Sequence, residues 1–199
     1  MTKQRIQSLH GTDDRRSSRA VRGFTLIELL MVIIVIGIVS TIALPAIRPS
    51  TYQVDAASLE LLGTLGLAQR TAVLRGHDLV LAFDSARHRV RIHYDENNDG
   101  VMQGNENVHA FALQDGVAFG RKNAPPRSLG AGFVSFDYDQ DGLSAVVFTR
   151  SGSASEAGII YLSPRGGAHP DENRAIEVDR GTGRARCYTY RDSAWEEKC

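Results

Sequence analysis

The most apolar stretch of the chain lies close to its start. Residues 24–47 read FTLIELLMVIIVIGIVSTIALPAI, and Glu28 is the only charged residue among them. A helix rises about 1.5 Å per residue, so some 20 residues of this kind cross a hydrocarbon core about 30 Å thick. Backbone groups in lipid must be satisfied within the segment, so a single span has to be helical. The pattern therefore predicts a transmembrane helix over residues 24–47.

The charges around this stretch predict its orientation. Residues 1–23 hold six basic and two acidic residues, a net charge of +4, and the rest of the chain has a net charge of −4. Basic residues before an apolar span stay in the cytoplasm, so residues after it are expected outside. A secretory signal peptide is the alternative, but its apolar core is about 7–15 residues long and a small-x-small cleavage site follows it. Pro49, Ser50 and Thr51 follow here instead.

Helical periodicity continues beyond the apolar stretch, through residues 48–76. Apolar residues recur at steps of three and four on one face, at Val54, Leu61, Leu65, Ala68 and Ala72. Gly76 follows Arg75 as a C-cap would. We expect one helix from about Phe24 to Arg75, loosened near Pro45 and Pro49.

After Gly76 the periodicity changes from helical to alternating. Short apolar runs read as strands, and clusters of Gly, Asn and Asp separate them. The predicted strands are residues 79–83, 90–94, 108–113, 133–138, 145–149, 158–162, 174–178 and 186–190. The segment 121–132, with two adjacent prolines, is predicted to be an exposed loop. We expect residues 77–199 to form a β-rich soluble domain. The fold class is α+β, with the long N-terminal helix packed on one face of an antiparallel sheet.

A plain membrane anchor does not explain Glu28, because a carboxylate in an apolar helix is costly unless it meets a partner. Residues 22–30, RGFTLIELL, resemble the prepilin signature of type IV pilins and type II secretion pseudopilins. The resemblance implies that a prepilin peptidase removes a leader by cutting after Gly23 and methylates Phe24. It also implies that Glu28 is the assembly glutamate, which would meet the free amine of a neighbouring chain.

The layout of the chain resembles the FimT/GspH group of minor pilins, which includes the H-type pseudopilin of type II secretion. Three stretches carry this resemblance: residues 68–76 (AQRTAVLRG), 146–153 (VVFTRSGS) and 174–186 (RAIEVDRGTGRAR). The group implies a structural subunit anchored in the cell inner membrane, with a periplasmic C-terminal domain. Together with other pilin-like subunits, it would assemble into a type II secretion pseudopilus or a type IV pilus.

The segment from Gly183 to Arg186 resembles the GRxR element with which FimT-type minor pilins contact DNA. Alternate residues of a strand point the same way, so Arg184 and Arg186 would project together, and guanidinium groups suit phosphates. A turn into the last strand with two solvated arginines is the other interpretation, and the acidic balance of residues 24–199 opposes general attraction to DNA. A DNA-binding minor pilin for DNA uptake is therefore the alternative function.

An acidic segment has the spacing of a calcium loop. Residues 95–100 read DENNDG, and the oxygen ligands of such a loop would come from Asp95, Asn97, Asp99 and Glu106. Strands rather than helices are expected on both sides, so an acidic hairpin turn is the alternative.

The chain has two cysteines, Cys187 and Cys199. They are expected to form one disulfide if this end lies in an oxidising periplasm, and two free thiols are the alternative.

Nothing in the sequence indicates catalysis. The six histidines show no metal-ligand spacing, and no Ser–His or Cys–His motif is apparent. We therefore expect a protein that is not an enzyme and has no cofactor apart from the calcium considered above.

Overall fold

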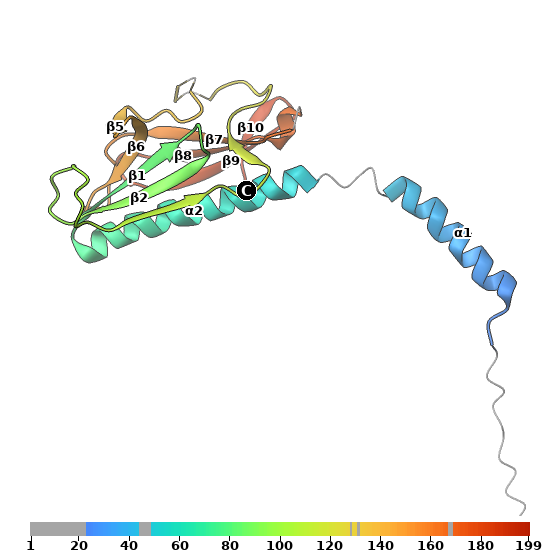
Figure 1. Cartoon of the computed structure of the whole chain (residues 1–199). Helices are drawn as coiled ribbons and strands as arrows, with labels where there is room; N and C mark the ends of the chain where they lie inside the picture. The colour runs from blue at the N-terminus through green and yellow to red at the C-terminus, as the bar shows by residue number, and fades with distance from the viewer. Residues whose placement is uncertain (1–22, 44–48, 128, 131, 167–168) are drawn as a thin grey trace, which may run out of the picture. The chain divides into compact units, whose positions relative to one another are not determined.

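The computed structural model describes residues 23–43, 49–127, 129–130, 132–166 and 169–199. The chain divides into two compact units, residues 1–47 and 48–199, and each is described by itself. The first contains α1 (Leu26–Ala43), and the second begins with α2 (Pro49–Arg75) (Figure 1). Two helices are therefore described where one was expected, and Pro45 lies outside the described residues.

α1 is apolar on all sides. Leu26, Met31 and Ile36 are among its exposed side chains, and the large apolar residues described in this helix are all at least 48% exposed. No helix in the described part of the chain is long and apolar enough to cross a membrane.

α2 is one-sided, as its sequence predicted. It begins at Pro49, whose fixed φ and missing N–H suit the first helical position. It ends where Gly76, at φ 71°, donates its N–H to the Ala72 carbonyl at 3.0 Å. The buried face consists of Val54, Ala57, Ser58, Leu61, Leu65, Ala68 and Ala72.

Ten strands among the described residues form two five-stranded sheets, and every named pair is antiparallel. The first sheet has the order β3-β2-β1-β6-β5, from β1 (Asp78–Asp84), β2 (Arg89–Asp95), β3 (Val108–Ala112), β5 (Tyr138–Gln140) and β6 (Leu143–Phe148). The second has the order β10-β9-β8-β7-β4, from β4 (Val117–Phe119), β7 (Gly158–Pro164), β8 (Arg174–Val178), β9 (Ala185–Arg191) and β10 (Ala194–Glu197). A short 3-10 helix, η2 (Pro170–Glu172), precedes β8.

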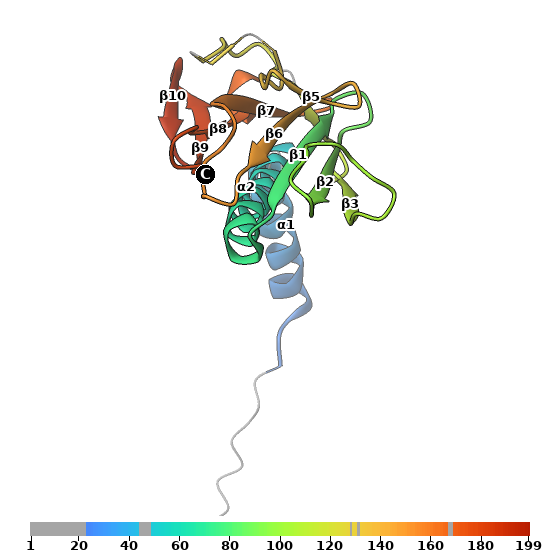
Figure 2. The ribbon, with the colours of Figure 1, turned by 90° about the vertical axis from the view of Figure 1, so that its left-hand side faces the viewer.

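The core lies between α2 and both sheets. Leu61 and Leu65 of α2 share one apolar cluster with Phe83 of β1, Ile160 of β7 and Ile176 of β8. Figures 1 and 2 show α2 running along one side of the sheets. The predicted α+β class, a helix on antiparallel β-structure, is confirmed, although the helix covers two sheets and not one.

The predicted strand at residues 133–138 is the main error in the β-region. Val134 makes only an isolated bridge to Ile160, and β5 begins at Tyr138. The Glu156 carboxylate accepts the backbone N–H groups of Asp137 and Tyr138 at 2.9 and 2.8 Å, so these two donors do not extend the pairing of Val134 with β7. Three short strands were not predicted, β4, β10 and β5, of which β5 shares only Tyr138 with the predicted strand, and the other predicted strands are confirmed.

Candidate functional site

The predicted processing and assembly residues lie together at the start of α1. Thr25 caps the helix, because its Oγ1 accepts the N–H of Glu28 at 3.3 Å. Gly23, Phe24, Thr25 and Glu28 line one open hollow. Among the residues that the structure describes, the Glu28 carboxylate has no hydrogen bond or ion pair. The helix start therefore presents one carboxylate within an exposed apolar surface.

Gly183 of the GRxR element has a structural role at the far end of α2. Its φ is 63°, and a Cβ placed on it would lie 2.5 Å from the carbonyl oxygen of Gly152. The Nε2 of Gln69 donates to that same oxygen at 2.7 Å and also to the Thr182 carbonyl. The three stretches that resemble the FimT/GspH group thus meet here, one from α2 and two from turns. Only glycine allows this close approach.

Arg184 and Arg186 are both exposed, as their alternate positions predicted. Their surroundings are acidic as well as basic. The pKa of Arg186 is raised, first by its hydrogen bond with Tyr188 and then by the charges of Glu197 and Asp179. These carboxylates weaken the local attraction for phosphate. DNA binding by this element stays a prediction.

In the predicted calcium loop, the acceptor oxygens already have donors. Asp95 accepts the N–H groups of Asp99 and Gly100, at 3.1 and 2.8 Å. The pKa of Asp99 is lowered, chiefly by the backbone N–H of Val101. Within the described residues, no three His, Cys, Asp or Glu side chains are grouped so that they could hold a metal ion. The loop has the hydrogen bonding of an acidic turn, and calcium binding stays a prediction.

Glu106, the predicted last ligand, belongs to a buried network that the sequence did not reveal. Its Oε2 lies 2.7 Å from Nε2 of His93, and both side chains are almost fully buried. The Nδ1 of His93 lies 2.8 Å from Nε2 of Gln140, whose Oε1 accepts from Arg91 at 3.3 Å. These bonds assign the proton of His93 to Nε2, which donates to Glu106. The only sign of this network in the sequence was a histidine, His93, within a strand of alternating apolar and polar residues.

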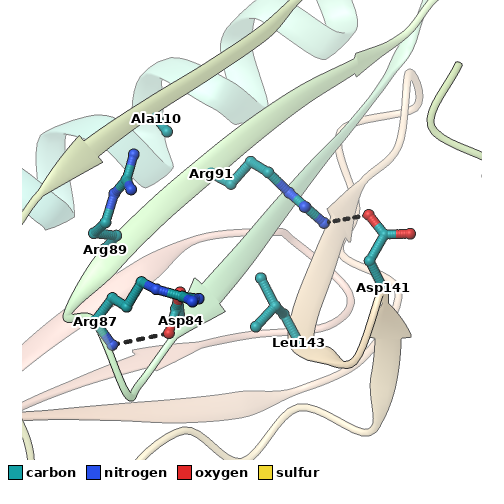
Figure 3. Close-up of a pocket in the computed structure, with 7 residues that line it drawn as sticks. All are labelled: Asp84, Arg87, Arg89, Arg91, Ala110, Asp141 and Leu143. Carbon is teal, nitrogen blue, oxygen red and sulfur yellow. Dashed lines mark hydrogen bonds and ion pairs between the residues drawn. The ribbon is translucent and has the colours of Figure 1, made fainter. Parts of the chain in front are cut away.

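A cluster of arginines on β2 and the preceding turn is the second feature that sequence reasoning missed. Arg89 and Arg91, two residues apart on one strand, line a hollow of about 310 Å³ with Arg87 (Figure 3). Arg91 pairs with Asp141 at 2.7 Å, and Arg87 pairs with Asp84 at 3.1 Å. Carboxylates from the same chain therefore compensate two of the three arginines.

Cys187 and Cys199 form a disulfide in the structure, with their Cα atoms 5.6 Å apart. The bond ties the last residue of the chain back to β9. The hairpin of β9 and β10 is closed by this bond.

An exposed apolar helix followed by an amphipathic helix packed on antiparallel sheets defines the class of pilin-like proteins. Family comparison agrees with this class. The prokaryotic N-terminal methylation motif matches residues 18–44, and type II transport protein GspH matches residues 57–183, more than half of the chain. The chain belongs to the GspH family and carries the prepilin-type methylation motif, which confirms the resemblance seen in the sequence.

Two solved structures are similar to this chain, and both are of the minor pseudopilin EpsH from the type II secretion system of Vibrio cholerae. Each is 16% identical in sequence. One match covers 69% of this chain and 97% of that chain, with a TM-score of 0.48. The other covers 72% and 99%, with a TM-score of 0.49. No curated protein matches the chain in sequence.

Proposed function

We propose that this protein is a structural subunit of a type II secretion pseudopilus or a type IV pilus, and not an enzyme. The observation that carries the proposal is the start of α1, where the methylation motif, matched over residues 18–44, includes an apolar helix whose one carboxylate has no partner among the described residues. Membership of the GspH family favours the secretion pseudopilus. The subunit would be a minor component, assembled with other pilin-like subunits.

Before assembly, residues 24–47 would anchor the chain in the inner membrane, with the basic residues 1–23 in the cytoplasm and the β-domain in the periplasm. Prepilin peptidase would cut after Gly23. That residue has no side chain, and a Cβ built on it meets no described atom within 4 Å, so the space around Gly23 is open. The new N-terminus would be the amine of Phe24.

Glu28 would then fix the register between subunits. A carboxylate surrounded by apolar side chains needs an opposite charge when water is excluded. The Phe24 amine of a neighbouring subunit has the matching charge and would lie at the same level of the apolar helix bundle. Contact between the two groups would therefore select one axial offset between neighbours.

The outward face of α2 supports the same packing. Tyr52, Leu59, Leu67 and Leu74 are more than half exposed and follow one another at steps of seven or eight residues. Such spacing places them along one side of a helix, opposite the face buried against the sheets. We infer that this stripe also contacts helices of neighbouring subunits.

Glu28→Gln tests this function. The substitution keeps the shape of the side chain and removes its charge. We expect cleavage after Gly23 to be normal, as judged by the mass of the membrane-bound chain. Incorporation into sheared filaments should fall by at least about ten-fold, which corresponds to about 1.4 kcal/mol.

The matched control is Glu60→Gln, which neutralises an exposed glutamate on α2. It should assemble like the wild-type chain. Normal incorporation of Glu28→Gln would remove the proposed role of Glu28 in assembly. A loss of protein secretion on deletion of the gene, with pili unchanged, would assign the subunit to a secretion pseudopilus.

A further inference from the structure

A second cationic hollow lies beside β4, at the free edge of the second sheet. Its volume is about 300 Å³, at the lower end of the range for small-molecule pockets. Three cationic side chains line it, Arg121, Lys122 and Arg165, and the lining contains no acidic residue. The hollow of Figure 3 differs, because Asp84 and Asp141 lie among its arginines.

The three cations have no counter-ion from this chain within its described residues. Arg165 is held by one bond, from its Nε to the Val117 carbonyl at 3.1 Å, which leaves its terminal nitrogens for a ligand. The Arg121 guanidinium lies over the Tyr161 ring, 5.1 Å from the centroid. Its Nε and Nη1 atoms are buried and have no hydrogen-bond partner in the described structure. Such donors favour an incoming acceptor.

A buried hydroxyl points to the same kind of ligand. Ser163 of β7 is fully buried, and its Oγ has no hydrogen-bond partner among the described residues. Gly120 and Ser163 both line the hollow, and a Cβ placed on Gly120 would lie 3.0 Å from this oxygen, so a side chain at position 120 would crowd the hydroxyl. A buried hydroxyl without a partner is unfavourable, and a bound anion would accept its proton.

His88 and two apolar residues complete the walls. The Nδ1 of His88 accepts the Phe119 N–H at 3.3 Å, which occupies a backbone donor at the end of β4. Burial lowers the pKa of His88, and the Arg165 charge lowers it further. A neutral ring keeps Nδ1 as an acceptor. Ala118 and the half-exposed Phe133 form the apolar side of the hollow, whereas the Phe119 ring is buried in the main core against Phe83.

We propose that this hollow is a carboxylate pocket, which receives one acidic side chain from a neighbouring subunit of the same filament. Arg165 and Arg121 bind the carboxylate, Ser163 donates a further hydrogen bond, and the apolar wall contacts the methylene groups of the side chain. The identity of the occupant rests on the proposed assembly function, whereas the preference of the pocket for a carboxylate rests on its lining residues alone.

The shape of the pocket favours a carboxylate on a side chain over a phosphate polymer. Nucleic acids are bound along a track of several phosphate contacts, whereas these cations surround a single hollow. The apolar wall formed by Ala118 and Phe133 has no role for an inorganic anion but fits aliphatic carbons. A planar guanidinium also matches the two oxygens of a carboxylate.

Binding can be measured on the full chain in detergent micelles by NMR. The probes are N-acetyl-glutamic acid amide and N-acetyl-glutamine amide, which differ only in charge and one donor group. We expect the glutamate probe to shift the amide signals of Gly120 and Ser163 with at least about ten-fold higher affinity than the glutamine probe. Arg165→Gln should weaken glutamate binding by about ten-fold or more.

Two further variants separate the pocket from folding and from general charge. Ser163→Ala removes the orphan hydroxyl without breaking any bond within the described structure, so the chain should fold while glutamate binding weakens. Arg89→Gln removes an exposed arginine of the other hollow and should leave binding unchanged. Equal binding of both probes, or equal losses in Arg165→Gln and Arg89→Gln, would overturn the pocket. Tighter binding of inorganic phosphate than of glutamate would overturn its assignment to a carboxylate.

The occupant is tested in cells, with Arg165→Glu beside Glu28→Gln. We expect Arg165→Glu to lower filament incorporation while the processed chain remains stable in the membrane. Wild-type incorporation of Arg165→Glu, together with loss of incorporation in Glu28→Gln, would overturn the subunit as occupant and leave the proposed function intact. Wild-type incorporation of Glu28→Gln would instead contradict the proposed role of Glu28, whatever the NMR titration shows.

Discussion

α1 and α2 follow one another along the chain and are both rich in apolar residues, yet among the described residues only α2 has a buried face. α1 is apolar on every side and stays exposed. In α2 one face is apolar and buried, the other is exposed, and the buried face packs on both sheets. The difference teaches that periodicity, and not hydrophobicity, marks the helix that belongs to the domain core. A helix that is apolar all round is suited to an apolar surrounding, such as lipid or other helices.

Two glutamates show the same contrast at the level of single groups. Glu106 is buried and accepts hydrogen bonds from His93, Gln103 and Glu96 within the domain. Glu28 has none of these partners in the described structure. A carboxylate with its partners inside the chain stabilises the fold, and one without them is available to another molecule.

The largest effect is expected from Leu65→Ala on the buried face of α2. Leu65 is fully buried in the main apolar cluster, so its loss leaves a cavity between α2 and the sheets. We expect the free energy of unfolding to fall by about 2–5 kcal/mol. Urea unfolding of the full chain in detergent, followed by Trp195 fluorescence, measures this change.

Leu67→Ala is the matched control two residues away. Leu67 is 64% exposed, so the same atoms are removed without a cavity. Its unfolding free energy should change by less than about 0.5 kcal/mol, and Leu30→Ala in α1 should behave likewise. If Leu30→Ala destabilised the β-domain as much as Leu65→Ala, the division between the two helices would be wrong.

Gly183→Ala should have the next largest effect, because it acts where the far end of α2 meets two turns. The added Cβ would collide with the Gly152 carbonyl and approach the Gln69 amide, at a φ that alanine rarely adopts. We expect a loss of about 1–3 kcal/mol in the same unfolding measurement. Gly181→Ala is the control, since its Cβ would meet only an Asp179 oxygen at 3.7 Å. Equal stabilities of these two variants would contradict a structural role for Gly183.

Much of the fold follows from local pattern. The buried face of α2 and most strands were predicted because each has a clear period and turn residues at its ends. The error at residues 133–138 has a different origin, since a side chain distant in sequence, Glu156, takes the backbone donors of Asp137 and Tyr138. The short strand β4 has only three residues, which is too few to show a period.

The candidate sites also divide into those carried by a local pattern and those formed by tertiary contacts. Gly23, Phe24 and Glu28 were predicted because they lie within one contiguous motif. The carboxylate pocket was not, since Ser163 and Gly120 are 43 residues apart and meet only through the second sheet. The GRxR element was predicted as a DNA contact, but tertiary contacts with Gln69 and Gly152 show that its glycine serves the fold.

Acid stability tests the contribution of the Glu106 carboxylate to the fold. The pKa of Glu106 is lowered from its ordinary value of 4.5, first by the hydrogen bond from His93 and then by the Gln103 N–H. Its contribution is therefore fully present above about pH 4.5 and is lost as the pH falls through the folded pKa. Glu106→Gln should reduce the slope of the unfolding free energy against pH below pH 4.5. The reduction corresponds to at most about one bound proton of difference between the folded and unfolded states.

The slope of Glu106→Gln is not expected to vanish, since the pKa values of Asp84, Asp99 and Asp179 are also lowered in the folded state. Urea unfolding of the wild-type chain and of Glu106→Gln at several values between pH 3 and pH 7 gives the two slopes. Equal slopes would show that the Glu106 carboxylate does not stabilise the fold.

The smallest effect is expected from replacing Arg184 and Arg186 together by Gln. The charges of Glu197 and Asp179 lie beside Arg186. If these carboxylates balance the charge of the arginines, Arg184 and Arg186 do not form a DNA site. A mobility-shift titration of the full chain in detergent, at several salt concentrations, should then give the same weak binding for both proteins. Two lost phosphate contacts would instead lower the log–log salt slope by about two and weaken binding at low salt. That result would identify the β-domain, and not only α1, as a surface for a second molecule, and would make the protein a DNA-binding minor pilin.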